Sequence, residues 1–203
     1  MNPSTTTLYG TRLKLTEALV VTISQSGRSP DVVNTVAQAR AGGALTVAIV
    51  NKEDSPLAEA AEFVLPMHAG VEQAVAATKT FIASLSAALH WLEAIQPERD
   101  LHIALMNLPR HLETALEVET QVRDAVGCYR DAEQMITLAR GLHYPMAMET
   151  ALKLKETCVI HAESFSTAEF AHGPIILAEA GCQSSAFKPA TPPPRVRTCT
   201  AKS

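Results

Sequence analysis

The sequence lacks the features that mark several classes of protein. Its 17 lysines and arginines are outnumbered by 21 aspartates and glutamates, for a formal net charge of −4. Without a basic excess, we expect neither a nucleic acid nor an anionic membrane as a partner. The longest apolar runs, such as residues 44–50, are too short to cross a bilayer. The amino terminus has no basic segment followed by an apolar stretch, so we expect no signal peptide.

Metal-ligand patterns are also missing. The four cysteines, at positions 128, 158, 182 and 199, show no CxxC pair and no cysteine–histidine spacing typical of a metal site. We therefore expect no metal and no other cofactor, and reduced thiols in a cytoplasmic protein. Hydrophobic residues make up 47% of the chain and charged residues 19%, which is enough for a sizeable core and excludes wholesale disorder.

Short apolar runs alternate with helical patterns along most of the chain. Buried strands are predicted at residues 18–23, 45–50, 62–65 and 135–139. Helices are predicted at residues 30–41, from Ser55-Pro56 onward, and at 71–94, 109–126 and 145–157. Continuous apolar strands separated by helices predict an α/β fold, with parallel sheets covered on both faces.

This pattern divides the chain into four segments. Residues 1–94 are predicted to form a first α/β unit, residues 95–134 a helical connector, and residues 135–181 the start of a second unit. Residues 182–203 carry four of the 12 prolines and four bases but no acid, so we predict a disordered or non-native tail. A shifted reading frame or truncation and an ordinary flexible tail both explain this composition.

The turn after the first predicted strand gathers polar groups. Ser24, Ser26 and Ser29 supply hydroxyls, Gly27 supplies flexibility, and the next helix supplies free N–H groups at its start. Such groups and the helix dipole favour a phosphate, and ligands bind outside the carboxyl ends of parallel strands. A plain capped strand-to-helix turn accounts for the same residues, and the pattern alone does not decide between the two.

A second cluster lies on a later predicted helix. Glu149, Lys153 and Glu156 fall within about 60° of one another because an α-helix turns 100° per residue. Exposed pairs at this spacing are usually solvated surface pairs. A general base held near a cation inside a cleft is the competing interpretation. His172 follows in sequence and is a further candidate, because histidine exchanges protons near neutral pH.

Five stretches of the sequence are distinctive when they are taken together. They are ISQSG at 23–27, AGVE at 69–72, VAATK at 75–79, YPMAMETALKLKE at 144–156 and the segment that continues through 174. These stretches resemble the sugar isomerase (SIS) domain family, and in particular the isomerase half of the glutamine–fructose-6-phosphate aminotransferases and their stand-alone relatives. The similarity extends over roughly residues 18–177 and is most specific from residue 144 onward.

The resemblance implies a fold and a substrate class. It implies tandem SIS units, each a parallel sheet flanked by helices in three layers, with both units incomplete in this chain. A sugar phosphate would lie near six residues of the first unit, four in the serine turn and two in a later loop that has alanine where the synthases usually have serine. The residues concerned are Ser24, Gln25, Ser26, Ser29, Val75 and Ala77.

The resemblance also implies catalytic roles. Glu156 would be the base that moves a proton between C1 and C2, Lys153 would stabilise charge near the enediol, and His172 would assist ring opening. In the family that histidine reaches the site of a neighbouring subunit, so a homodimer is expected.

The expected reaction is aldose–ketose isomerisation of a hexose 6-phosphate with transfer or release of an amino group. No glutaminase half is expected here, which favours a deaminase-like relative over a synthase. A non-catalytic sugar-phosphate-binding regulatory module and an inactive, truncated fragment remain open. Because an incompletely covered parallel sheet exposes apolar faces, we expect low stability for the chain on its own.

Overall fold

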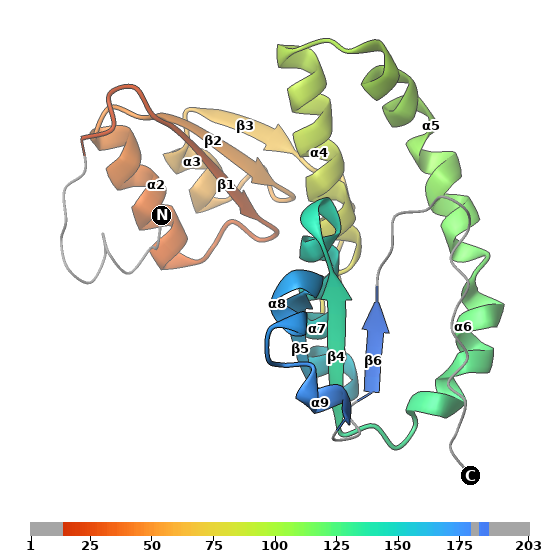
Figure 1. Cartoon of the computed structure of the whole chain (residues 1–203). Helices are drawn as coiled ribbons and strands as arrows, with labels where there is room; N and C mark the ends of the chain where they lie inside the picture. Colours follow the sequence, from red (N-terminus) through yellow and green to blue (C-terminus); the bar gives the residue numbers. More distant parts are fainter. Residues whose placement is uncertain (1–13, 180–182, 187–203) are drawn as a thin grey trace. The chain divides into compact units, whose positions relative to one another are not determined.

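The fold contains two compact units, each built on a parallel sheet. The computed structural model describes residues 14–179 and 183–186 of the chain (Figure 1). The first unit is Met1–Pro109 and the second is Arg110–Ser203. Each holds a three-stranded sheet whose strands all pair in parallel. The predicted α/β class, with parallel strands flanked by helices, is confirmed.

In the first unit the strand order is β1-β2-β3. Its strands are in register at one edge, since Ser24 pairs with Val50 and Val50 pairs with Pro66. The carboxyl ends of all three strands therefore meet at the same edge of the sheet. Its elements are β1 (Leu19–Ser24), α2 (Pro30–Ala41), β2 (Leu45–Val50), α3 (Pro56–Ala60), β3 (Phe63–Pro66) and α4 (Lys79–Ile95).

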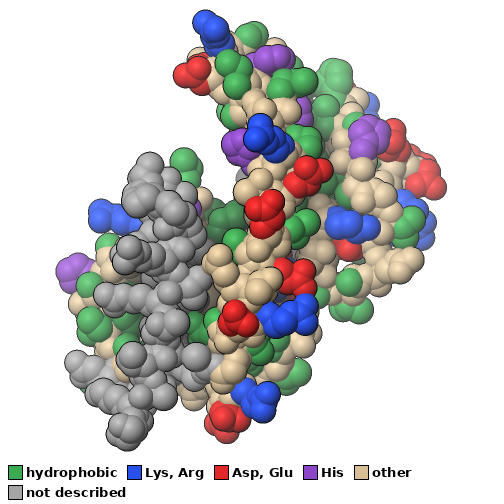
Figure 2. All heavy atoms as spheres, turned by 90° about the vertical axis from the view of Figure 1, so that its right-hand side faces the viewer, with side chains coloured by type: hydrophobic (Ala, Val, Ile, Leu, Met, Phe, Trp, Pro, Cys, Tyr) green, Lys and Arg blue, Asp and Glu red, His purple; other side chains and the backbone are tan. Residues whose placement is uncertain are grey.

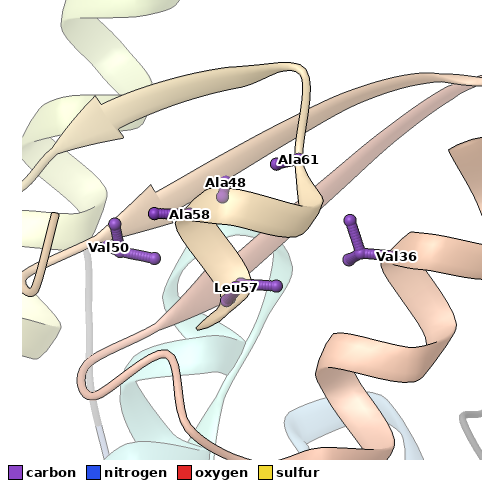
Figure 3. Close-up of a cluster of buried hydrophobic side chains, with 6 residues drawn as sticks. All are labelled: Val36, Ala48, Val50, Leu57, Ala58 and Ala61. Carbon is purple, nitrogen blue, oxygen red and sulfur yellow. The ribbon is translucent and has the colours of Figure 1, made fainter. Parts of the chain in front are cut away.

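The core of this unit lies between the central strand and two helices. Val36 of α2 and Leu57 of α3 are fully buried against Ala48 and Val50 of β2 (Figure 3). Helix α4 contacts the same strand. Val47 and Ile49, which alternate with Ala48 and Val50 along β2, are also buried. A central parallel strand that is apolar along its whole length is buried on both faces in this way. The prediction for residues 45–50 is confirmed.

The prediction that the first strand is buried is wrong for one of its faces. Leu19, Val21 and Ile23 are 50%, 40% and 53% exposed. β1 lies at one edge of the sheet in the described part of the chain and contacts α2, and the alternating residues of a strand point to opposite faces. The apolar run is therefore covered on one side, and the side bearing these three residues faces solvent.

Helix α4 also differs from its prediction, because it begins at Lys79 rather than near residue 71. Residues 71–78 form a non-helical loop instead. Gly70, just before this loop, has a φ of 69°. That left-handed conformation suits glycine and directs the chain away from a continuous helix.

In the second unit the strand order is β5-β4-β6. Helix α7 packs against β4 and β5, and Met135, Ala151 and Ala162 form the buried cluster between them. The elements are α5 (Arg99–Leu116, which spans the boundary between the units), α6 (Glu119–Ala125), η1 (Val126–Tyr129), β4 (Gln134–Ala139), η2 (Gly141–His143), α7 (Tyr144–Cys158), β5 (His161–Ser166), α8 (Thr167–Ala171), α9 (Ile176–Glu179) and β6 (Gln183–Ala186).

The helix predicted at residues 109–126 is wrong in its bounds. α5 begins at Arg99 and continues through Pro109, and α6 starts after a short break. A proline within a helix removes one backbone hydrogen bond, and the turns on either side keep this helix continuous. The boundary between the compact units falls at Pro109, inside the segment predicted as a connector.

The sheet of the second unit extends past the predicted domain end. Strand β6, at Gln183–Ala186, pairs in parallel with β4. Part of the segment predicted as a tail therefore belongs to a sheet. The rest of that segment, residues 187–203, lies outside the described residues.

Candidate functional site

The turn between β1 and α2 is fixed by a close approach to α3. Gly27 has a φ of 63°, and a Cβ placed on it would lie 2.2 Å from the Oγ of Ser55. Ser55 is fully buried, and the backbone N–H of Leu57 donates to the Gly27 carbonyl at 3.0 Å. The position therefore requires glycine for both its conformation and its lack of a side chain.

The serines predicted to bind phosphate lie around this glycine. The Oγ of Ser24 accepts from the N–H of Gly27 at 3.1 Å, and the Oγ of Ser26 accepts from the N–H of Arg28 at 3.4 Å. Ser29 is the N-cap residue of α2, but its side chain makes no capping hydrogen bond, and it is exposed. The start of a 12-residue helix thus presents N–H groups and a free hydroxyl, an arrangement suited to an anion.

A cavity of about 380 Å³ opens at the same edge of the sheet. Gln25, from the β1–α2 turn, lines one part of it. The remaining lining residues follow the ends of β2 and β3, and sequence reasoning did not assign them a role. They are Asn51, Lys52, His68, Gly70, Val71 and Glu72. Their position directly after two predicted parallel strands was the available signal.

The side chain of Asn51, which follows β2, hydrogen-bonds to the backbone of the segment that follows β3. Its Nδ2 donates to the carbonyl of Gly70 at 2.7 Å, and its Oδ1 accepts from the N–H of Ala69 at 3.0 Å. His68, the residue before this pair, has a φ of 51°. A left-handed conformation is uncommon outside glycine, and the two hydrogen bonds from Asn51 hold the backbone just beyond it.

Glu72 explains why the predicted helix begins late. Its Oε2 accepts from the N–H of Thr78 at 3.1 Å, and from the N–H and Oγ1 of Thr80 at 3.1 and 3.2 Å. The hydrogen bond from the Thr80 backbone is the largest cause of a lowered pKa for Glu72. The carboxylate caps α4 from the far side of the loop, so residues 71–78 cannot continue the helix.

This loop carries the two positions that the family resemblance assigned to the sugar. Val75 is fully exposed, and Ala77 is partly buried. Lys79 closes the loop from its other end, since its Nζ donates to the carbonyl of Val71 at 2.7 Å. Val75 and Ala77 therefore lie on a short loop that is closed by an internal hydrogen bond, between the end of β3 and the start of α4.

In the second unit, the candidate catalytic residues lie on α7. Thr137 of β4 is fully buried, and its Oγ1 donates to the carbonyl of Ala147 at 2.9 Å. Ala147 and Ala151 are buried on the face of α7 that meets the sheet. Small residues on that face let the helix approach the strands closely, and the hydroxyl of Thr137 fixes its position along β4.

The predicted charged cluster forms on this helix. The Nζ of Lys153 lies 2.6 Å from Oε2 of Glu156 and 3.3 Å from Oε1 of Glu149. The three side chains are only 23%, 33% and 22% exposed, in that order. The hydrogen bond with Glu156 is the largest cause of a raised pKa for Lys153. The cluster is thus a mutually paired set at the surface, in which Glu149 and Lys153 are partly buried and Glu156 is exposed.

His172 stands apart from that cluster within the described residues. It is exposed at the carboxyl end of α8, where its backbone N–H donates to the carbonyl of Glu169 at 3.0 Å. No hydrogen bond or ion pair joins it to Glu156 or Lys153 in the described part of the chain. The predicted residues therefore form one local set in each unit, and His172 joins neither set through a hydrogen bond or ion pair of the described residues.

Within the described ranges, 14–179 and 183–186, no group of three or more metal-ligating side chains occurs, and no helix is long and apolar enough to cross a membrane. On the face shown in Figure 2, side chains of both charges are interspersed. These observations leave the two local sets and the cavity as the candidate functional features.

The parallel strands, the glycine-dependent turn and the cavity at one edge are features of an α/β domain with a candidate ligand site at the carboxyl ends of its strands. The family model described as "SIS domain" matches residues 13–94 and 129–181. The chain belongs to this family.

Curated relatives of the chain are aminotransferases. The chain is 37% identical over 194 residues to the glutamine–fructose-6-phosphate aminotransferase (isomerizing) of Treponema pallidum, covering 91% of this chain and 31% of that protein. It is 40% identical over 160 residues to the enzyme of the same name from Aquifex aeolicus, covering 78% of this chain and 27% of the relative. The chain thus spans about a third or less of the length of these relatives.

Solved structures agree with this assignment. The carboxy-terminal domain of glucosamine–fructose-6-phosphate aminotransferase from Francisella tularensis superimposes with a TM-score of 0.77 at 33% identity, covering 85% of this chain and 51% of that one. A candidate phosphosugar isomerase from Silicibacter pomeroyi gives a TM-score of 0.86 at 41% identity, covering 94% and 57%. The fold is that of SIS phosphosugar proteins.

Proposed function

We propose that this chain binds a hexose 6-phosphate and contributes to aldose–ketose isomerisation in which an amino group at C2 is transferred or released. Its membership of the SIS family and the names of its relatives support this substrate class. The observation that carries the proposal is the paired cluster on α7, where Lys153 contacts Glu156 at 2.6 Å. Such a reaction needs a carboxylate that can accept a proton and a nearby cation that can stabilise developing negative charge.

The first unit would hold the phosphate. The hydroxyls of Ser24, Ser26 and Ser29, the side chain of Gln25 and the N–H groups at the start of α2 surround one turn. Phosphate binding at a site remote from the reacting carbons supplies the energy that orients those carbons. Ser26→Ala should therefore weaken every phosphosugar ligand.

The second unit would supply the acid–base chemistry. Glu156 would take a proton from one of the two carbons C1 and C2 and return it to the other, passing through an enediol. Lys153 would stabilise the negative charge that develops on the adjacent oxygen. His172 would protonate the ring oxygen during opening, in a neighbouring subunit of a homodimer. Its exposure leaves it available for that role.

The test is proton exchange at C2 of glucosamine 6-phosphate and at C1 of fructose 6-phosphate, whose C2 bears no hydrogen. Incorporation of deuterium from solvent at these carbons, followed by NMR, should fall about a thousandfold in Glu156→Gln. Binding of either phosphosugar should change little, because the substitution keeps size and removes only the charge. Glu149→Gln is the matched control, since Glu149 contacts the same lysine at 3.3 Å, and it should retain most of the exchange.

Two outcomes contradict the proposal. Unchanged exchange in Glu156→Gln would remove Glu156 as the base. Binding without any exchange in the wild-type chain would replace the isomerase with a sugar-phosphate-binding module. The subunit assignment has its own test, in which mixing Glu156→Gln with His172→Ala should restore exchange that each variant lacks alone.

A further inference from the structure

We propose that Lys52 and His68 form a second anion-binding subsite, which meets the end of the ligand remote from its phosphate and favours negative charge there. The inference rests on the proposed placement of the phosphate at the β1–α2 turn. It assigns a function to cavity residues that the catalytic roles proposed above do not use. The ligand class is a phosphosugar whose far end carries a negative charge, such as a sugar-acid phosphate.

The position of the cavity supports this subsite. Gln25 belongs both to the serine turn and to the cavity lining, so the two features are continuous. The volume of about 380 Å³ lies within the range of ligand sites in proteins. Lys52 follows the end of β2 and His68 follows the end of β3. A ligand anchored at the end of β1 would therefore extend past the ends of the neighbouring strands.

The wall that carries His68 is held in an unfavourable conformation. His68 has a φ of 51°, a left-handed conformation that costs free energy for a residue other than glycine. The two hydrogen bonds of Asn51, at 2.7 and 3.0 Å to the next two residues, fasten this backbone. A strained backbone that hydrogen bonds hold at the edge of a cavity is typical of a functional site. We therefore infer that this conformation positions the side chain of His68.

The charges around the cavity favour an anion at Lys52. In the described ranges, no hydrogen bond or ion pair engages the ammonium group of Lys52. Glu53 and Asp54 follow it in sequence but do not line the cavity. Glu72 does line it, yet its Oε2 faces the start of α4, where the backbone N–H groups of Thr78 and Thr80 offset its charge.

A matched pair of ligands isolates this subsite. 6-Phosphogluconate and glucitol 6-phosphate differ only at C1, which is a carboxylate in one and a hydroxymethyl group in the other. Calorimetry on the full chain should show that 6-phosphogluconate binds about tenfold more tightly, the effect of one charge-assisted contact. Lys52→Met should bring the ratio of the two dissociation constants close to one, and Lys52→Arg should retain most of it.

Controls separate this inference from the proposed function. Ser26→Ala should weaken both ligands equally and leave their ratio unchanged, and Lys14→Met, at an exposed lysine outside the cavity lining, should alter neither affinity. His68→Ala should lower the ratio by a smaller factor than Lys52→Met.

A ratio that survives Lys52→Met in a folded protein would overturn the subsite. Equal binding of both ligands by the wild-type chain would overturn it as well. Unchanged affinities in Ser26→Ala would instead remove the phosphate turn and the proposed function. Failure of the wild-type chain to bind either ligand would overturn both.

Discussion

The first and second units each place candidate functional residues after a parallel strand, but they fix those residues by different means. After β1, the turn is fixed by the close approach of the Gly27 backbone to Ser55. After β4, the functional side chains lie along α7, and the hydroxyl of buried Thr137 holds that helix. Binding groups in the first case are largely backbone and hydroxyl groups, whereas those in the second are long charged side chains.

The difference shows which substitutions each site tolerates. A site made of backbone N–H groups depends on sterics, because one added methyl group moves the whole turn. A site made of side chains on a rigid helix depends on that helix keeping its position against the sheet. The two units should therefore respond to different classes of mutation.

The largest effect is expected at Gly27. Gly27→Ala must adopt a left-handed φ and place its Cβ 2.2 Å from Ser55 Oγ, so the free energy of unfolding of the first unit should fall by about 3 kcal/mol. Gly70→Ala is the matched control, with a φ of 69° but nothing within 4 Å of its Cβ, and should cost about 1 kcal/mol. Hydrogen exchange of β1–β3 under denaturant measures both, and equal losses would contradict the steric account.

Thr137 is the counterpart in the second unit. Thr137→Val removes a fully buried hydrogen bond to the Ala147 carbonyl and should lower the stability of the second unit by about 1.5 kcal/mol. Thr157→Val also removes a hydroxyl bonded to a carbonyl of α7, at 2.6 Å, but on the exposed face. That control should lose under about 0.5 kcal/mol. Equal losses in hydrogen exchange of β4 and β5 would show that burial is not what gives Thr137 its effect.

A smaller, opposite effect is expected where α7 ends. Val159 has a φ of 58° and is 91% exposed, so a β-branched residue occupies a strained position with few contacts to lose. Val159→Gly should raise the free energy of unfolding by about 1 kcal/mol, because relief of strain exceeds the extra entropy of the unfolded glycine. Val126→Gly, at an exposed position with a φ of −55°, should instead lower it. Thermal unfolding distinguishes the two signs.

The smallest expected effect is a loss of stability of the first unit at low pH. Since the pKa of Glu72 is lowered in the folded protein, its carboxylate stabilises the fold at pH values above the ordinary glutamate pKa of about 4.3. That contribution is lost as the pH falls through the lowered pKa, because the protonated group no longer accepts as strongly from Thr78 and Thr80. The stability difference between wild type and Glu72→Gln should therefore shrink in acid, and a constant difference would contradict this.

Features set by local pattern were predictable from the sequence. The bounds of β2 at Leu45–Val50 matched, because a central strand is apolar on both faces. The pairing of Lys153 with Glu149 and Glu156 followed from helical spacing alone.

Features set by contacts between distant residues were not predictable. The loop at 71–78 has a helical pattern, but the left-handed Gly70 and the hydrogen bond from Thr80 to Glu72 delay the start of the helix. The apolar run of β1 resembles that of a central strand, although β1 lies at an edge. The cavity joins residues after three strands, and no single stretch of sequence contains its pattern.

The amide of Asn51 has a further consequence for the lifetime of the protein. Hydrolysis of that amide to a carboxylate would replace the Nδ2 donor by an oxygen facing the Gly70 carbonyl, across what is now a 2.7 Å hydrogen bond. The new carboxylate oxygen would repel the Gly70 carbonyl oxygen, and the strained backbone at His68 would lose a hydrogen bond that holds it. Chemical ageing of one side chain would thus reshape the cavity without any change in the gene.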